Sequence, residues 1–172
     1  ELTKVYRTIM RVFKFGGASV KDAEGVKNVA KVLQREGVEN TLVVISAMGK
    51  MTNAFEAIIN AYYNDSNDLS EKIKYVEKYH QEIISNLFVK DDEIYNEINF
   101  LFGELSGVLA ITTSQDYNFI YDQIVGFGEL LSTNIVSAYL TKTGVNNQWL
   151  DVRDYIKTDT SYRDAKVNWE LT

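Results

Sequence analysis

The chain has 172 residues, of which 45% are hydrophobic and 24% are charged, a composition typical of one globular domain. Its net charge of −6 argues against general nucleic-acid binding, and the absence of cysteine excludes disulfides and thiolate metal sites. It contains neither an apolar run of about 18 residues nor a recognisable signal peptide, so we expect no membrane partner and a cytoplasmic location.

The first elements predicted along the chain are a strand, a helix and a second strand. VFKF (12–15) is predicted to be a short buried strand that ends at a pair of glycines. Residues 22–36 carry an apolar stripe at helical spacing, and Gly37 follows where a helix commonly ends. The continuous apolar run TLVVIS (41–46) is typical of a strand covered on both faces. This order and spacing predict a βαβ unit with two parallel strands.

The middle of the chain is predicted to be helical. Apolar residues recur at helical spacing in four segments, 51–63, 69–88, 92–111 and 115–142, and Gly144 closes the last of them. Two short strands are predicted at 147–152 and 154–159. No proline, internal repeat or low-complexity stretch marks a boundary, so residues 1–172 are predicted to be a single domain. The last dozen residues show no clear period, so this domain is expected to be truncated. Residues 1–9 precede Met10, which could be a natural start.

A positive charge and two glycines stand together at the end of the first strand. Lys14 lies within the apolar run, and Gly16 and Gly17 follow it before a helix. Glycines let backbone N–H groups approach an anion closely, and a lysine ammonium can bridge phosphate oxygens. A phosphate site is one interpretation, and a surface lysine beside an ordinary turn is the other.

Small and hydroxyl-bearing residues follow the second strand in the sequence SAMGKMTN (46–53). Ser46 or Thr52 could donate a hydrogen bond to a ligand carboxylate, whereas Thr52 could equally be the N-cap of the next helix. Ligands of open α/β sheets bind outside the carboxyl ends of the strands. Two such loops on neighbouring strands therefore favour a shared site more than either loop alone.

The third segment of interest is VGFGELLSTN (125–134). Gly126 and Gly128 interrupt a long apolar helix, where each glycine costs about 1 kcal/mol relative to alanine. We expect a packing or close-approach reason for them. Glu129 follows, and its carboxylate could hold a ligand ammonium or could simply be exposed on the helix.

These segments resemble the aspartokinases of the amino acid kinase family. FKFGGASV resembles the family's Lys-Phe-Gly-Gly-Thr-Ser-Val, and VVISAMGKMTN, GFGELLS and WLDVRDYIKTD resemble its later motifs in the family order. The resemblance implies an α/β fold, the three-layer αβα amino acid kinase (carbamate kinase-like) fold. This chain would be its N-terminal amino-acid-binding lobe, with a partly parallel sheet and a helix-rich middle insertion.

The activity that the resemblance implies is ATP-dependent phosphorylation of the β-carboxylate of L-aspartate, the first step of lysine, threonine and methionine biosynthesis. Mg²⁺ would accompany the nucleotide, with no protein ligands assigned to it, and the full-length enzyme would be a homo-oligomer. The residue roles carried over are Lys14 as the catalytic group, Lys14, Phe15, Gly16 and Gly17 at the nucleotide phosphates, and Ser46, Thr52 and Glu129 at the aspartate.

Departures from the family pattern limit what is expected of the chain. Ala18 and Gly126 stand where the family has threonine and commonly serine, which removes two hydroxyls near the pocket. The family's later Arg-Gly-Gly-Ser-Asp segment, ATP lobe and regulatory ACT domains are not in the sequence, so we expect the chain alone to be inactive. The parent could be monofunctional or fused to a homoserine dehydrogenase.

Two other functions stay open, namely another amino acid kinase of the acetylglutamate or glutamate type, and a non-catalytic module that binds an amino acid or anion. The sole histidine, His80, is expected to be a satisfied, partly buried residue rather than a catalyst. The acidic stretch KDDEIYNE (90–97) is expected to be a solvated helix start rather than a metal site.

Overall fold

The computed structural model describes residues 10–114 and 116–172. Residues 1–9, including the sequence before Met10, and Gln115 in the predicted 115–142 helix lie outside the described residues. The elements in chain order are β1 (Arg11–Phe15), the 3-10 helix η1 (Gly17–Val20), α1 (Ala23–Glu36), β2 (Thr41–Ile45), α2 (Met51–Tyr63), α3 (Leu69–Leu87), α4 (Ile94–Ile111), α5 (Tyr117–Val125), α6 (Phe127–Lys142), α7 (Val152–Tyr155) and the 3-10 helix η2 (Tyr162–Asp164).

The predicted βαβ unit is confirmed. Strands β1 and β2 pair in parallel, with Arg11 opposite Thr41 and Phe15 opposite Ile45. Helix α1 connects them, and the side chain of Asp22 caps its first turn by accepting from the Gly25 amide at 2.8 Å. Since both strands run the same way, their carboxyl ends lie side by side at one edge of the sheet.

The prediction that the second strand is covered on both faces is wrong for the described residues. One face of the sheet packs on the core through Phe13, Val43 and Ile45. The opposite face leaves Val12 62% exposed, and Leu42 and Val44 43% exposed. Every second side chain on each strand is therefore exposed, and the side chains between them are half-buried or buried.

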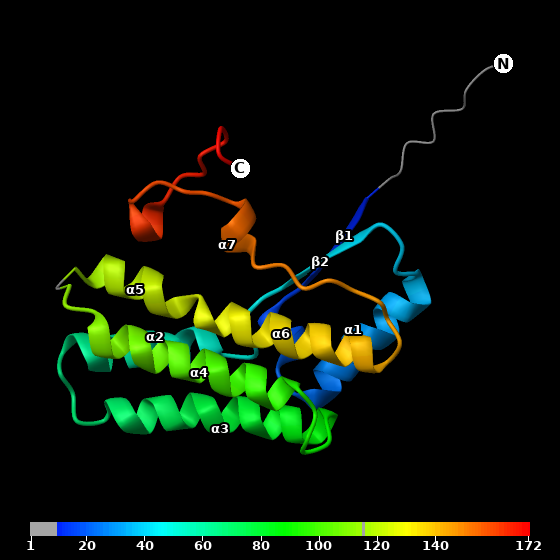
Figure 1. Cartoon of the computed structure of the whole chain (residues 1–172), viewed down its shortest axis with the longest axis horizontal. Coiled ribbons are helices and arrows are strands. Elements are labelled where there is room, and N and C mark those ends of the chain that lie inside the picture. Colours follow the sequence, from blue (N-terminus) through cyan, green and yellow to red (C-terminus); the bar gives the residue numbers. More distant parts are fainter. Residues whose placement is uncertain (1–9, 115) are drawn as a thin grey trace.

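Helices α2 to α6 form the bulk of the molecule, and Figure 1 shows α5 and α6 end to end in one row with α4 and α3 alongside. Helix α2 packs on α3 and α5, and α4 packs on α6. The long predicted helix is two helices that meet at Gly126, whose amide bonds back to the Ile124 carbonyl. A continuous core of buried aliphatic and aromatic side chains joins these helices to α1 and β2.

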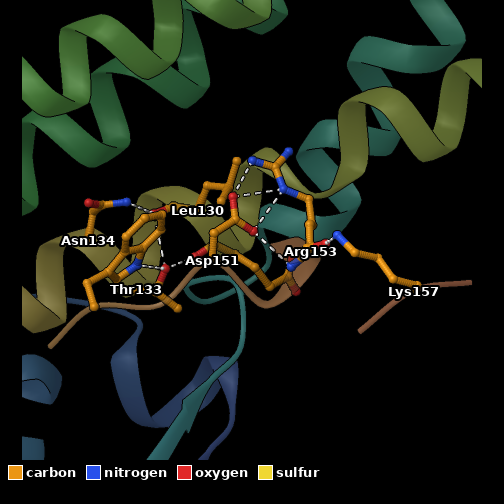
Figure 2. Close-up of polar contacts among 8 residues, drawn as sticks. Leu130, Thr133, Asn134, Asp151, Arg153 and Lys157 are labelled. Atoms are coloured by element: carbon orange, nitrogen blue, oxygen red, sulfur yellow. Dashed lines mark hydrogen bonds and ion pairs between the residues drawn. The ribbon is translucent and has the colours of Figure 1, made fainter. Parts of the chain in front are cut away.

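The two predicted strands at 147–152 and 154–159 are wrong. Residues 146–151 are irregular, residues 152–155 form α7, and the pairing that follows is one antiparallel bridge between Thr158 and Val167. The segment is held by side chains instead of a sheet (Figure 2). The Trp149 indole N–H donates to the Thr133 hydroxyl of α6 at 2.9 Å, and Arg153 folds back onto the Asp151 carboxylate at 2.5 Å.

None of the helices within the described ranges has the length and hydropathy needed to cross a bilayer.

Candidate functional site

The two glycine-containing loops at the strand ends are joined to each other through their backbones. The Ser46 amide donates to the Phe15 carbonyl at 3.1 Å, and the Gly49 amide donates to the Gly17 carbonyl at 2.9 Å. A Cβ on Gly17 would lie 2.7 Å from the carbonyl oxygens of both Ala47 and Gly49. No side chain fits in that space, so glycine at position 17 is what lets the loops meet.

Lys14 lies at this edge with its ammonium above the first glycine. Its Nζ is 3.7 Å from the position that a Cβ on Gly16 would take. The side chain is exposed, and among the described residues it makes no ion pair. The ammonium is thus available to an incoming anion, and Gly16 leaves the backbone beside it open.

Glu129 reaches the same edge from the first turn of α6. Its side chain is exposed, but Oε1 accepts a hydrogen bond from the Ala47 amide at 3.2 Å, across 82 residues of sequence. One carboxylate oxygen is therefore fixed by the loop, and Oε2 remains for a ligand cation. The start of a helix is also a favourable place for a negative charge.

Gly128 allows this approach, whereas Gly126 does not take part in it. A Cβ on Gly128 would lie 3.0 Å from the Ala47 Cβ and 3.4 Å from the Phe55 ring, tighter than an ordinary contact. The expected close-approach reason is thus found at Gly128. At Gly126 a Cβ would meet nothing within 4 Å, so that position has free space in front of it.

Ser46 and Thr52 have different surroundings. Ser46 is half-buried at the start of the second loop, where its amide bonds to the Phe15 carbonyl of the first strand. Thr52 is exposed in the first turn of α2. The alternative that Thr52 caps this helix is wrong, because the N-cap residue is Lys50 and no side chain makes the capping bond. The structure therefore brings Lys14, the glycines, Ser46 and Glu129 together, and it places Thr52 in helix α2, just after the second loop.

A cavity of about 950 Å³ opens beside Glu129. It is bounded by β2, by one side of α6 including Gly126 and Thr133, and by residues 145–156. Most of its wall is aliphatic or aromatic, while Glu129, Asp151 and Arg153 supply charge. A small polar ligand at the strand ends would thus meet the Glu129 carboxylate and could extend into the cavity beside it.

His80 takes no part in this site. It is fully buried on α3, and its Nδ1 lies 2.8 Å from the Val76 carbonyl oxygen. Burial lowers the pKa of His80 to about 4, so the imidazole is neutral at pH 7. The expectation of a non-catalytic histidine agrees with this position, but the expectation of partial burial and full satisfaction is wrong, since Nε2 has no hydrogen-bond partner in the described structure.

The acidic stretch after α3 is also explained without a ligand. Asp92 accepts from the Val89 amide and pairs with Lys142 at 2.9 Å. This lysine, by bonding to the carboxylate, lowers the pKa of Asp92. Over residues 10–114 and 116–172, no three His, Cys, Asp or Glu side chains gather as a metal site would require.

Two features of the site were not predicted from the sequence. One is the Ala47 amide, the partner of Glu129, which no side-chain motif marks. The other is Tyr79 of α3, whose hydroxyl donates to the Lys21 carbonyl just beyond η1. These contacts join residues that are 82 and 58 positions apart in the sequence, so no local sequence pattern predicts them.

Comparison with known proteins places this chain in a family. The amino acid kinase family matches residues 10–170. The chain is 33% identical over 153 residues to the bifunctional aspartokinase/homoserine dehydrogenase 2 of Arabidopsis thaliana, covering 84% of this chain and 16% of that protein. It is 31% identical to aspartokinase 1 of the same plant over 158 residues, covering 86% of this chain and 26% of that protein. Both relatives are named chloroplastic.

Solved structures agree with the sequence relatives. Escherichia coli aspartokinase III in complex with aspartate and ADP superposes with a TM-score of 0.80 at 27% identity, covering 95% of this chain and 36% of that one. The same enzyme with lysine and aspartate also gives 0.80, covering 92% of this chain and 35% of that one. The predicted amino acid kinase fold is confirmed, and the chain spans about a third or less of the length of the proteins it matches. The chain belongs to the amino acid kinase family.

Proposed function

We propose that this chain is the amino-acid-binding part of an aspartate kinase, which transfers the γ-phosphoryl group of ATP to the β-carboxylate of L-aspartate. The observation that carries the proposal is the meeting of Lys14, the Gly16–Gly17 turn and Glu129 at one sheet edge. Relatives named aspartokinases, and a neighbour solved with aspartate and ADP, support this choice of substrates.

The reaction needs little proton chemistry. The side-chain carboxylate of aspartate has a pKa of about 3.9 and is already ionised at neutral pH. One of its oxygens bonds to the γ-phosphorus as the bond to the β,γ-bridging oxygen breaks, giving 4-phospho-L-aspartate and ADP. Positioning and neutralisation of charge are then the main contributions of the protein. A site without histidine suits this chemistry, since His80 is buried away from it.

Each residue role follows from charge and place. Lys14 would stabilise negative charge on the transferring phosphoryl group, while Phe15, Gly16 and Gly17 carry the backbone along the nucleotide phosphates. Glu129, with Oε1 bound to Ala47, would accept the substrate ammonium on Oε2. Hydroxyl groups for the aspartate would come from Ser46 and Thr52. Mg²⁺ would enter on the nucleotide phosphates, because the described residues offer no carboxylate cluster for it.

The test is to detect aspartyl hydroxamate with the protein in its full natural length. Lys14→Ala should lower kcat by about 100-fold or more, because it removes a charge that acts in the transition state. Glu129→Ala should act mainly on binding and raise the KM for aspartate by about 10- to 100-fold, the value of a charge-assisted hydrogen bond.

Matched controls are Lys31→Ala and Glu97→Gln, two exposed charges on α1 and α4. Variants with the kinetics of the parent at positions 14 and 129 would contradict the site. A parent that phosphorylates glutamate or acetylglutamate but not aspartate would be another amino acid kinase. A parent that binds aspartate and ATP without forming an acyl phosphate would be a binding module.

We also propose that the 172-residue chain alone lacks turnover, which the same assay tests directly. Support comes from its span of 35% and 36% of the aspartokinase III chains. A cytoplasmic location and a homo-oligomeric full-length enzyme complete the proposal. Fusion to a homoserine dehydrogenase stays open, since relatives of both kinds match.

A further inference from the structure

Tyr79 links the helical part of the molecule to both glycine loops. Its hydroxyl donates to the carbonyl of Lys21, the residue that ends η1 after the first loop. The same oxygen lies 2.6 Å from the position that a Cβ on Gly49 would take, so it also touches the second loop. The Tyr79 hydroxyl thus packs between the segment that follows β1 and the loop that follows β2.

Gly49 transmits this contact to the centre of the site. It adopts a left-handed conformation with φ of +54°, and its amide donates to the Gly17 carbonyl. Gly17 in turn touches the carbonyl oxygens of Ala47 and Gly49 closely enough to exclude any side chain. The hydroxyl of Tyr79 is therefore one contact away from the loop junction beside Lys14.

Helix α3 is a firm support for such a contact. Val76 and His80, which flank Tyr79 on the helix, are fully buried, and Ile83 one turn later is nearly so. Burial raises the pKa of the Tyr79 hydroxyl, so it keeps its proton and remains a donor at neutral pH. By contrast, Tyr75 one turn earlier is 59% exposed.

We propose that Tyr79 is a positioning residue that holds the two glycine loops in register for phosphoryl transfer. This role rests on the proposed function of the same site. Preorganised loops lower the barrier because the donors need not reorder as charge moves onto the phosphoryl group. Tyr79 hydrogen-bonds neither to Glu129 nor to Ala47, and it meets the second loop at Gly49, two residues beyond the amide that Glu129 binds. Its loss should therefore leave aspartate binding largely intact.

The kinetic test compares Tyr79→Phe with the matched control Tyr75→Phe in the full-length protein. Removal of the Tyr79 hydroxyl should lower kcat about five- to tenfold, the equivalent of one hydrogen bond, with the KM for aspartate nearly unchanged. Tyr75→Phe should have the kinetics of the parent. Equal kinetics for the two variants would overturn the proposal.

Amide hydrogen exchange gives a readout that does not require activity. In Tyr79→Phe the amides of Ser19 and Gly49, which bond to Gly16 and Gly17, should exchange faster, while the amides of α4 keep their rates. Unchanged exchange at both loop amides would overturn the proposal. An equal increase throughout α3 and α4 would indicate a general loss of stability and would overturn it too.

A double-mutant cycle measures the coupling between Tyr79 and Gly49 separately from the other effects of each substitution. Gly49→Ala places a methyl group 2.6 Å from the Tyr79 oxygen but 3.6 Å from the ring carbon beneath it. The drop in Tm caused by Gly49→Ala should therefore be smaller in the Tyr79→Phe background than in the parent. Additive changes would contradict the contact. If the parent forms no aspartyl hydroxamate, the proposed function fails, and exchange and the cycle alone decide the role of Tyr79.

Discussion

At the scale of single residues, three glycines at or beside the candidate site have different roles. Gly17 and Gly128 both lie against Ala47. A Cβ on Gly17 would be 2.7 Å from the Ala47 carbonyl oxygen, and a Cβ on Gly128 would be 3.0 Å from the Ala47 Cβ. Gly126 has open space at its Cβ position and lines the cavity beside Glu129. The first two glycines are thus required by the assembly of the site, whereas position 126 can accept a serine without collision.

His80 makes stability depend on pH in a defined window. Its pKa is about 4 in the folded chain and about 6.5 when unfolded, so the unfolded chain binds more protons between these values. The contribution of the neutral, buried His80 to stability is therefore fully present above pH 6.5 and is lost as the pH falls toward 4. Between pH 7 and pH 5 the free energy of unfolding should fall by about 2 kcal/mol, measured by urea titration.

The control for this prediction is His80→Leu, which removes the titrating group and keeps an apolar side chain. Its stability should be nearly constant from pH 7 to pH 5. The carboxyl groups with lowered pKa, Asp68, Asp92, Asp151 and Asp159, lose their contributions only below about pH 4, outside this window. Identical slopes for parent and variant would show that His80 is not the cause.

At the scale of elements, α4 carries two glycines that nothing in the structure requires. Gly103 and Gly107 are exposed inside the helix, and a Cβ at either would meet no atom within 4 Å. Replacing each with alanine should raise the free energy of unfolding by about 0.5 to 1 kcal/mol, because the unfolded chain loses freedom. Thermal unfolding measures this gain.

The matched comparison is Gly25→Ala in α1, where a Cβ would lie 2.5 Å from the Ser19 carbonyl oxygen. That substitution should lower the Tm even though alanine is the better helix former. A rise in Tm for all three variants would mean that helix propensity alone governs these positions.

Elements whose signals are local were predictable, and elements that depend on distant partners were not. The stripe of Val26 and Leu33 and the left-handed Gly37 define α1 from its own residues, and both are found. Residues 147–152, with Trp149, Leu150 and Val152, also have the composition of a short strand, but whether they form one depends on the elements that pack beside them. This segment faces the cavity and α6, and its polar groups bond to Thr133 and within the segment.

The same distinction between local signals and distant partners applies to the candidate site. Lys14 and its glycines could be proposed because they stand at the end of a predicted strand, and Glu129 because two glycines interrupt the predicted helix just before it. That Glu129 binds the Ala47 amide, and that Tyr79 joins the loops, depends on how α6 and α3 pack on the sheet. Sequence periodicity gives the face of a helix but not its neighbours.

At the scale of the whole molecule, the two-stranded sheet has an exposed apolar face and, within the described residues, an unpaired β2 edge. Free edges and apolar faces promote pairing between chains. The 172-residue chain should therefore self-associate as its concentration rises, which light scattering coupled to size-exclusion chromatography would measure.

Val12→Lys and Leu42→Lys place charges on that face and should shift the chain toward monomer. Val89→Lys is the matched control, because Val89 is 67% exposed but lies between α3 and α4, away from the sheet. A parent that stays monomeric at every concentration, or a control that acts as strongly as the sheet variants, would contradict this prediction.

The contact between Glu129 and Ala47 has a consequence for the order of folding. It closes a loop of 82 residues that contains α2, α3, α4 and α5, and such long-range closure is slow and entropically costly until the intervening helices have packed. The βαβ unit can form from neighbouring sequence, whereas the carboxylate can reach its loop only afterwards. Core substitutions in those four helices will therefore lower the population of molecules with an assembled site, even at positions that, unlike Phe55 beside Gly128, do not contact it.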